Sequence, residues 1–277
     1  MQFGSYRPVT LCSLLFKLFE RVLQFRIGAL IRTKIDTTQL GFRPRLGMDL
    51  PIAAICAYFA DVGARSERLP THESHTRVTH RDKGIIAHVD ATDAFCRAPI
   101  SLFIAALLRL GVHPRYARCI SHYLSSRTMR VRHRNRITSP VGFDGGFTQG
   151  SVNGGLFWLV VANELALSFA PLRSPSIGHV AMVPILVADD LFVLLKTTRP
   201  DLAASSLKAF LRTAASWGKR WGIEFSSKSR GMLVTNSPSG IDPWLFTVSV
   251  PAVSIAITRA PLRVLGVVLD STLSLEA

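Results

Sequence analysis

The stretch ILVADDLFVLL, residues 185–195, places two adjacent carboxylates in the middle of an otherwise apolar run. A buried ionised carboxylate without a partner is costly, and Asp189 and Asp190 also repel each other, so folding alone does not explain them. The apolar flanks predict two central strands, with both carboxylates in the turn between them. We therefore expect a cation to meet the two side chains.

Composition predicts a globular protein that binds a polyanion. The chain has 277 residues and is 48% hydrophobic, enough to build the core of one large domain or of two modest ones. Its 33 Lys and Arg against 18 Asp and Glu leave a formal charge of +15. Nucleic acid is the commonest partner of such a chain, although basic surfaces also serve membranes and ribosomes.

The cysteines and the apolar runs indicate an intracellular location. Four cysteines, at positions 12, 56, 96 and 119, show no zinc-knuckle spacing and are expected to be reduced thiols. No apolar run of about twenty residues is free of charged or polar groups, so we expect no membrane span and no signal peptide. His72, His75 and His80 lie in a polar segment and are interpreted as solvated rather than metal-binding.

Periodicity predicts a mixture of helices and strands. An amphipathic helix with a basic outer face is expected after a Thr10 cap, with the apolar stripe Leu11, Leu14, Leu15, Leu18, Val22 and Leu23. Further helices are expected after Pro51, over 101–112 and after Pro200, where the spacing marks Leu207, Phe210, Leu211, Ala214 and Trp217. Strands are expected from residue 84 and in a hairpin at the end of the chain. This order indicates an α/β or α+β fold.

A basic hairpin is predicted at residues 127–143, where TMRVRHRNRITSPVGF alternates and Asn135 takes a turn position. Its charge is concentrated in Arg127, Arg130, Arg132, Arg134 and Arg136. Charge on an edge hairpin can simply prevent aggregation. With the net charge of the whole chain, contact with nucleic-acid phosphates is the favoured interpretation.

The carboxylates fit a divalent metal site. Mg²⁺ prefers oxygen ligands, and two such ions about 4 Å apart can serve an in-line displacement at phosphorus. Asp90 ends a predicted strand and would complete the set formed by Asp189 and Asp190. By itself the ADD turn is weak evidence, because Asp is also common in solvated β-turns.

Three segments in order, HVDATDAF (88–95), FTQGSVNGGLF (147–157) and VADD (187–190), resemble the central palm motifs of reverse transcriptases. Four flanking segments extend the resemblance to the LINE-type (non-LTR) retrotransposon enzymes over nearly the whole chain: SYRPVTLCSLLFKLFERVL, QLGFRPRLGMDLPI, WGKRWGIEFSSKSRGMLV and LRVLGVVLD. The resemblance implies an α+β right-hand polymerase palm, an antiparallel sheet backed by helices, with a partial fingers subdomain. Residues 1–84 would be the fingers part and 85–277 the palm, including a primer-grip hairpin at 262–277, with no thumb and no endonuclease.

The resemblance also implies roles for individual residues. Asp90, Asp189 and Asp190 would bind two Mg²⁺ ions, for which Mn²⁺ can substitute. Lys228 would neutralise or protonate the departing pyrophosphate. Arg43 would bind the triphosphate, and Phe95 would exclude a 2′-hydroxyl and so select deoxynucleotides. The loop residues Gln149, Gly150 and Ser151 would hold the template base and the nucleotide.

Two departures from the family pattern bear on the expected efficiency of DNA synthesis. Val187 stands where an aromatic residue usually precedes ADD, and Asn153, Gly154 and Gly155 replace Leu-Ser-Pro after the QGS segment. None of these changes removes a metal ligand. Glycines at a helix start cost roughly 1 kcal/mol each relative to alanine.

The resulting hypothesis is an RNA-directed DNA polymerase domain that uses an RNA template, a DNA primer and deoxynucleotides, and that works in the nucleus. The first alternative is a truncated remnant that binds nucleic acid but synthesises weakly or not at all. Another alternative is a basic structural protein in which ADD occurs by chance. It is disfavoured because it leaves the seven motifs in register unexplained. An RNA-dependent RNA polymerase shares the palm chemistry but fits poorly with Phe95.

Overall fold

The computed structural model describes residues 9–60, 62, 83–92, 94–143, 145–174, 180–235 and 242–273. The chain forms two compact units, the first from residues 1–36, 93–164 and 219–223, and the second from residues 37–92, 165–218 and 224–277. His72, His75 and His80 lie outside the described residues. The assignment of 1–84 to fingers and 85–277 to palm stays a prediction.

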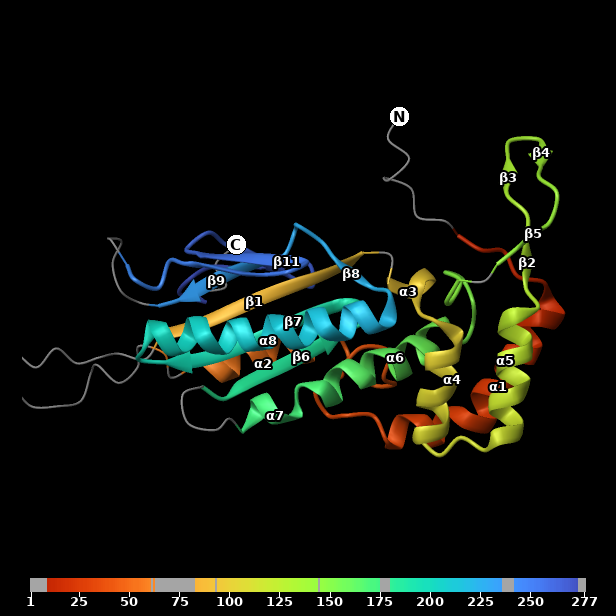
Figure 1. Cartoon of the computed structure of the whole chain (residues 1–277), viewed down its shortest axis with the longest axis horizontal. Coiled ribbons are helices and arrows are strands. Elements are labelled where there is room, and N and C mark those ends of the chain that lie inside the picture. The colour runs from red at the N-terminus through yellow and green to blue at the C-terminus, as the bar shows by residue number, and fades with distance from the viewer. Residues whose placement is uncertain are drawn as a thin grey trace, which may run out of the picture. The chain divides into compact units, whose positions relative to one another are not determined.

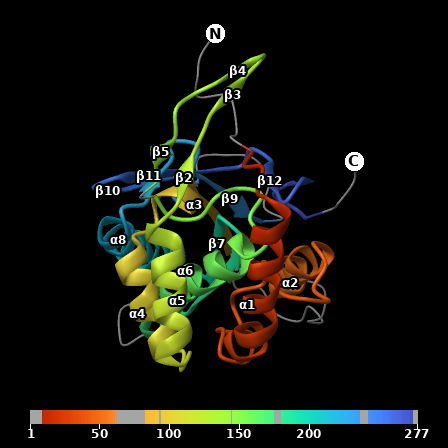
Figure 2. The ribbon, with the colours of Figure 1, turned by 90° about the vertical axis from the view of Figure 1, so that its right-hand side faces the viewer.

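The first unit is mainly helical and carries the basic hairpin. Its helices are α1 (Leu14–Thr33), α3 (Ala94–Arg97), α4 (Ile100–Arg109), α5 (Pro114–Ser125) and the first part of α6 (Gly154–Ser168). Figure 2 shows α4 and α5 side by side. After α5, β2 (Thr128–Met129) pairs with β5 (Val141–Gly142), and β3 (Arg132–His133) pairs with β4 (Arg136–Ile137). The hairpin expected from the alternating sequence is therefore present.

Helix α1 buries a different face from the one predicted. Its buried residues are Glu20, Leu23, Ile27, Gly28 and Ile31. The predicted stripe is exposed except for Leu23, as in Leu14 with an exposed fraction of 84%. The prediction was wrong because this helix is apolar on more than one side, so that its sequence alone did not identify the stripe that packs.

The start of α1 also differs from the prediction. Ser13, not Thr10, is the N-cap, and its Oγ accepts a hydrogen bond from the backbone N–H of Phe16 at 3.2 Å. Thr10 instead donates its backbone N–H to the carbonyl of Gln149 at 2.8 Å. Thr10 thus contributes to the fold by holding a distant loop of the same unit.

The second unit is built on a mostly antiparallel sheet with the strand order β10-β11-β9-β1-β7-β6, to which β8 is added on β1 (Figure 1). The strands are β1 (Lys83–Thr92), β6 (Met182–Val187), β7 (Asp190–Thr197), β8 (Glu224–Phe225), β9 (Arg230–Val234), β10 (Thr247–Val250) and β11 (Val253–Thr258). Of the two strands predicted to be central, β7 is interior but β6 ends this order. A bridge from Gln39 to Leu186 covers the outer side of β6.

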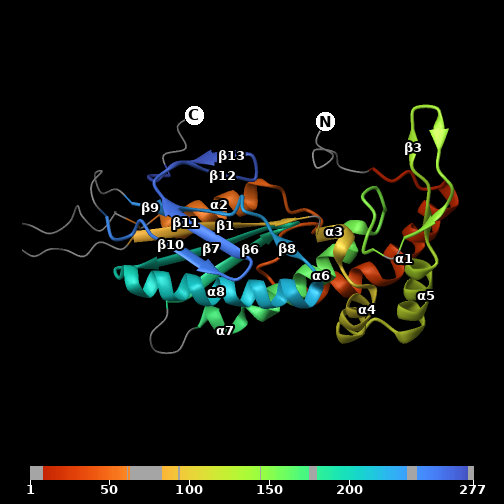
Figure 3. The ribbon, with the colours of Figure 1, turned by 45° about the horizontal axis from the view of Figure 1, so that its top comes forward.

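Both faces of the sheet are covered, which explains why β1 and β7 read as continuous apolar runs. Figure 3 shows α8 (Pro200–Trp221) along one face, and α2 (Asp49–Phe59) with the hairpin β12 (Leu262–Val264) and β13 (Val267–Leu269) on the other. The predicted core positions of α8 are buried: Leu207, Phe210, Leu211, Ala214 and Trp217. On the α2 side, Ile86, Phe192 and Leu194 belong to one cluster with Ile55 and Val264.

Two further expectations can be compared with the structure. All four cysteines are free thiols, as predicted. Among the described helices, including the short α7 (Ala170–Arg173), none combines the length and the apolar character needed to cross a lipid bilayer.

Candidate catalytic site

The two carboxylates of the VADD segment occupy the tip of the β6–β7 hairpin. Val187 pairs with Asp190, so the turn consists of Ala188 and Asp189, and Asp190 is the first residue of β7. Ala188 has a φ of +56°, a conformation that costs a residue with a Cβ about 1–2 kcal/mol. The structure thus holds this turn in a strained shape, which supports a functional role for the hairpin tip.

Asp90 lies directly opposite Asp190, because β1 and β7 pair in a register that aligns the two residues. Side chains of directly opposite residues point to the same face of the sheet, and like charges in this arrangement repel each other. Both residues are partly buried. Among the described residues, no lysine or arginine forms an ion pair with either carboxylate.

A histidine that the sequence analysis missed joins these two carboxylates. The ligand atoms of His88, Asp90 and Asp190 all lie within 4.8 Å of one another, and His88 Nε2 is 2.7 Å from Asp190 Oδ1. Asp189 is outside this group, in the adjoining turn. The sequence could have indicated His88. It precedes Asp90 by two residues, and side chains two residues apart on a strand lie on the same face of the sheet.

The segment 38–43 supports the β6–β7 hairpin along the outer edge of β6. The Leu186 carbonyl accepts the Leu40 N–H at 2.7 Å, and the Leu186 N–H donates to the Thr38 carbonyl at 2.9 Å. A Cβ on Gly41 would lie 2.2 Å from the backbone nitrogen of Ala188. Gly41 therefore allows the two backbones to meet.

Arg43, predicted to bind the triphosphate, follows Gly41 by two residues. Its Nη1 donates to the carbonyl of Gln39 at 3.3 Å, and the residue is partly exposed. One bond to a neutral carbonyl leaves most of the five guanidinium donors for other partners.

Lys228 lies in a turn that is attached to the backbone of Asp90. The Ser226 N–H donates to the Asp90 carbonyl at 2.7 Å, and the Asp90 N–H donates to Ser229 Oγ at 3.2 Å. Ser229 Oγ also donates to the Ser226 carbonyl at 2.8 Å, and Lys228 is exposed within this turn. Lys228 was predicted from the sequence, whereas the two serines that attach its turn to the backbone of Asp90 were not.

In the first unit, the loop with Gln149, Gly150 and Ser151 has a fixed backbone. Gly150 has a φ of +104°, and a Cβ there would lie 2.5 Å from the Thr10 carbonyl oxygen. Both the dihedral angle and the close approach require glycine. Glycine at this position therefore has a structural reason, while the role of the loop in binding the template base and the nucleotide stays a prediction.

Glu20, fully buried in α1, anchors this loop and was not selected from the sequence. Its carboxylate accepts hydrogen bonds from Ser151 Oγ, from the Val152 N–H at 2.8 Å and from the Tyr123 hydroxyl at 2.7 Å. Burial, followed by the hydrogen bond to Glu20, raises the pKa of the Tyr123 phenol. The Glu20 backbone carbonyl also accepts from Asn153 Nδ2 at 2.9 Å.

Phe95 stacks on an aromatic residue of the same unit. Its ring lies 4.8 Å from that of Trp158 in α6, with an interplanar angle of 22°. The carbonyl of Phe95 accepts from the Phe147 N–H at 2.7 Å. Packing thus fixes the orientation of the ring. A residue that excludes a 2′-hydroxyl by its bulk would need such a fixed orientation.

The five predicted nucleic-acid-binding arginines have two different environments. Arg127 is partly buried, donates to the carbonyls of Leu124, Gly145 and Gly146 at 2.7–2.8 Å, and lies over the Phe143 ring. The other four are exposed on the hairpin: Arg130, Arg132, Arg134 and Arg136. Arg127 therefore stabilises the base of the hairpin, whereas the other four present their charges to solvent.

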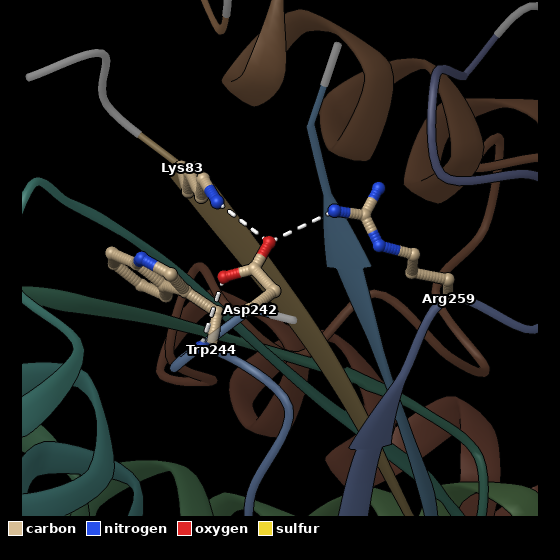
Figure 4. Close-up of polar contacts among 4 residues, drawn as sticks. All are labelled: Lys83, Asp242, Trp244 and Arg259. Atoms are coloured by element: carbon tan, nitrogen blue, oxygen red, sulfur yellow. Dashed lines mark hydrogen bonds and ion pairs between the residues drawn. The ribbon is translucent and has the colours of Figure 1, made fainter. Parts of the chain in front are cut away.

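A second carboxylate centre in the second unit shows the opposite arrangement. Figure 4 shows Asp242 between two cations, with Oδ2 2.7 Å from Lys83 Nζ and 2.9 Å from Arg259 Nη2. The Trp244 N–H donates to Oδ1 at 3.1 Å. Burial raises the pKa of Asp242, but the hydrogen bonds from Lys83 and Trp244 and the two positive charges outweigh it and hold the pKa below its ordinary value.

Comparisons with known proteins agree with this geometry. The family described as "Reverse transcriptase (RNA-dependent DNA polymerase)" matches residues 2–269. The chain is 28% identical over 274 residues to the "Probable RNA-directed DNA polymerase from transposon BS" of Drosophila melanogaster, covering 96% of this chain and 26% of the relative. It is 24% identical over 280 residues to the "Probable RNA-directed DNA polymerase from transposon X-element" of the same organism, covering 98% and 27%. The chain thus spans about a quarter of the length of these relatives.

Solved structures match the fold. Apo telomerase from Candida tropicalis superposes with a TM-score of 0.57 and 10% identity, covering 94% of this chain and 40% of that one. Telomerase from the same yeast in complex with a fragment of telomeric RNA gives 0.53 at 10% identity, covering 80% and 34%. These matches confirm the predicted α+β right-hand polymerase fold. With the family match over nearly all of its length, the chain belongs to the reverse transcriptase family and is a domain of the LINE, non-LTR type.

Proposed function

We propose that this chain is the polymerase core of an RNA-directed DNA polymerase, which extends the 3′-hydroxyl of a DNA primer on an RNA template with deoxynucleotides. The observation that supports this most is the opposed pair Asp90 and Asp190, with which no lysine or arginine of the described part of the chain forms an ion pair. An oxygen-rich donor set at the end of two paired strands suits a hard divalent cation.

Asp90, Asp189 and Asp190 would hold two Mg²⁺ ions, with Mn²⁺ as a substitute. When bound, such ions lower the pKa of the attacking hydroxyl and stabilise the charge on the leaving pyrophosphate. The Ala188 turn and the close backbone approach at Gly41 would hold the backbone of the hairpin tip in one conformation. Family membership implies divalent metal use; the identity and number of the ions are our proposal.

Two cations would bind the phosphates of the nucleotide. The Arg43 guanidinium can bind phosphate oxygens bidentately with the donors that Gln39 leaves unused. Lys228, exposed in the turn attached to Asp90, would neutralise or protonate the departing pyrophosphate. The Ser226 and Ser229 contacts would keep this turn aligned with the catalytic strand.

The first unit would contribute contacts to sugar, template and backbone. Phe95 would exclude a 2′-hydroxyl, and Gln149, Gly150 and Ser151 would hold the template base and the nucleotide. The hairpin arginines Arg130, Arg132, Arg134 and Arg136 would contact nucleic-acid phosphates, with Arg127 holding the hairpin base. For sugar selection, Phe95→Ala should increase ribonucleotide use relative to deoxynucleotide use. An unchanged ratio would remove this role from Phe95.

The experiment that tests the proposal is extension of a DNA primer on an RNA template with deoxynucleotides and Mg²⁺ at low salt. The chain is compared with its Asp189→Asn, Asp190→Asn double variant, and circular dichroism confirms that both are folded. We expect extension only by the unmodified chain. Equal extension by both would refute the metal assignment.

A second candidate function is a domain that binds nucleic acid without synthesis. Val187 favours it, because this residue is 4% exposed and packs in the core, so it cannot offer the aromatic contact that the family usually has at this position. The same assay separates the two functions. Retained template binding without any extension would establish the second.

We also infer that synthesis takes place in the nucleus. The relatives are described as transposon polymerases, and a transposon copy has to join chromosomal DNA. Fractionation of cells that express the protein tests this inference, and exclusive recovery from the cytoplasm would contradict it.

A further inference from the structure

We propose that His88 is a ligand of the catalytic metal site, and that its imidazole makes the site more selective for Mn²⁺ over Mg²⁺ than carboxylates alone would. The proposal rests on the proposed function, because it concerns the ion held by Asp90 and Asp190. His88 was not among the residues that the family motifs identified.

The position of His88 on the sheet directs its ring toward the carboxylates. His88 precedes Asp90 by two residues in β1, so both side chains leave the strand on the same face. The register pairs His88 with Phe192 and Asp90 with Asp190. The His88 ring stacks on Phe192, with centroids 4.7 Å apart and an interplanar angle of 20°. This stacking directs an otherwise mobile imidazole toward the carboxylates.

The distances between the three side chains suit a single octahedral ion. Neighbouring ligand atoms of an octahedral ion lie about 3 Å apart and opposite ones about 4.2 Å, for metal–ligand distances of about 2.1 Å. His88 Nε2 and Asp190 Oδ1 are 2.7 Å apart, and the three ligand atoms lie within 4.8 Å of one another. Small side-chain rotations therefore bring all three to one ion.

The donor atoms of the site also favour a transition metal. Mg²⁺ takes oxygen ligands almost exclusively, whereas first-row transition metals such as Mn²⁺ and Zn²⁺ accept imidazole nitrogen. A site of one imidazole and two carboxylates therefore gains affinity for the transition metal without losing its oxygen ligands. The His88 side chain is 17% exposed and that of Asp190 is 34% exposed, so an ion from solvent can reach both.

The alternative role for His88 is to position Asp190 through a hydrogen bond. Two substitutions separate this role from ligation. His88→Phe keeps a flat ring on Phe192 but removes the nitrogen, and His88→Gln keeps a hydrogen-bond donor for Asp190 but removes the imidazole. His122→Phe, at an exposed position of α5, is the matched control.

The experiment is pulsed electron paramagnetic resonance on the Mn²⁺-loaded full chain, without nucleotide or nucleic acid. We expect a coupling between Mn²⁺ and nitrogen, with frequencies that change when histidine carries ¹⁵N. This coupling should be lost in His88→Phe and His88→Gln and kept in His122→Phe. Mn²⁺ affinity should fall about tenfold or more in both His88 variants. Mg²⁺ affinity should change much less.

Three results would overturn the proposal. These are Mn²⁺ bound without a histidine coupling, a coupling that survives in His88→Phe, or no Mn²⁺ binding by the unmodified chain. Mg²⁺-dependent primer extension is measured on the same preparations. Its persistence in any of these cases would leave the proposed function standing while the ligand role of His88 fails.

Discussion

Asp242 and the pair formed by Asp90 and Asp190 are carboxylates of the same unit, but of these three only Asp242 forms ion pairs with lysine or arginine among the described residues. Lys83 and Arg259 surround Asp242, whose side chain is 6% exposed. Asp90 and Asp190 face each other, and Asp190 Oδ1 lies 2.7 Å from Nε2 of the His88 ring. The first arrangement is complete without a ligand, whereas the second places two like charges together.

Glu20 in the first unit shows a third arrangement. It is fully buried, and neutral donors from Ser151, Val152 and Tyr123 satisfy its carboxylate. Cations stabilise Asp242 and hydrogen-bond donors stabilise Glu20, so carboxylates that serve the fold have their partners within the chain. The pair Asp90 and Asp190 differs: Asp190 contacts His88, but among the described residues neither carboxylate forms an ion pair with a lysine or an arginine. This difference is the physical argument for an external cation.

The largest expected effect follows from removing one carboxylate of the opposed pair. Asp90→Asn should lower primer extension by about a thousandfold or more, since it removes charge stabilisation in the transition state. The free energy of unfolding without metal should stay the same or rise, because the repulsion with Asp190 disappears. Extension rates and urea unfolding measure the two quantities. A strongly destabilised variant would show that Asp90 serves the fold instead.

The matching change at Asp242 should have the opposite profile. Asp242→Asn leaves Lys83 and Arg259 without their anion and should lower the free energy of unfolding by about 3 kcal/mol, at the low end for a buried pair because both cations are partly exposed. Metal affinity should not change. Urea unfolding and calorimetric titration with Mg²⁺ check this. Equal loss of metal affinity in both variants would remove the distinction between the two centres.

Glu20→Gln tests the third arrangement. The amide group of glutamine would oppose hydrogen-bond donors, so we expect a loss of about 2 kcal/mol in the free energy of unfolding. Tyr123→Phe, the matched control, removes one donor and should cost about 1 kcal/mol. Thermal unfolding of both variants measures this. If Glu20→Gln were neutral, the loop would be held by its backbone contacts alone.

The pH dependence of stability gives a second test of the Asp242 ion pairs. Its pKa is lower in the folded protein than in the unfolded chain, so its contribution is fully present above the unfolded pKa. That contribution is lost as the pH falls from the unfolded value of about 3.9 through the folded pKa. Asp242→Asn should therefore flatten the fall of the unfolding free energy in this acidic window. Parallel curves for both proteins would contradict the ion-pair account.

The smallest effect concerns the cations of the hairpin. Arg132→Gln with Arg134→Gln should make the slope of log affinity against log salt less steep by about 1–2, with unchanged stability. Arg127→Gln, whose guanidinium binds three carbonyls, should instead destabilise the hairpin base. An unchanged slope in the double variant would remove the exposed arginines from the binding surface.

The sequence predicted what local pattern and motif order can encode. The strand with Asp90, the α8 core positions, the basic hairpin and the mixed fold are present in the structure. His88, Ser226 and Ser229 were missed because their importance depends on strand register and on a turn that returns to Asp90. Glu20 was missed because a charged residue in an apolar helix looks solvent-exposed until the loop that it binds is placed. The same helix misled the choice of its buried face.

The measurement that tests the central claim most directly is calorimetric titration of the unmodified chain with Mg²⁺ and Mn²⁺, beside Asp90→Asn and Asp242→Asn. If an external cation completes the opposed pair, the unmodified chain and Asp242→Asn bind the ions alike, and Asp90→Asn loses the binding. Binding that survives in Asp90→Asn, or that is absent from the unmodified chain, would contradict the claim.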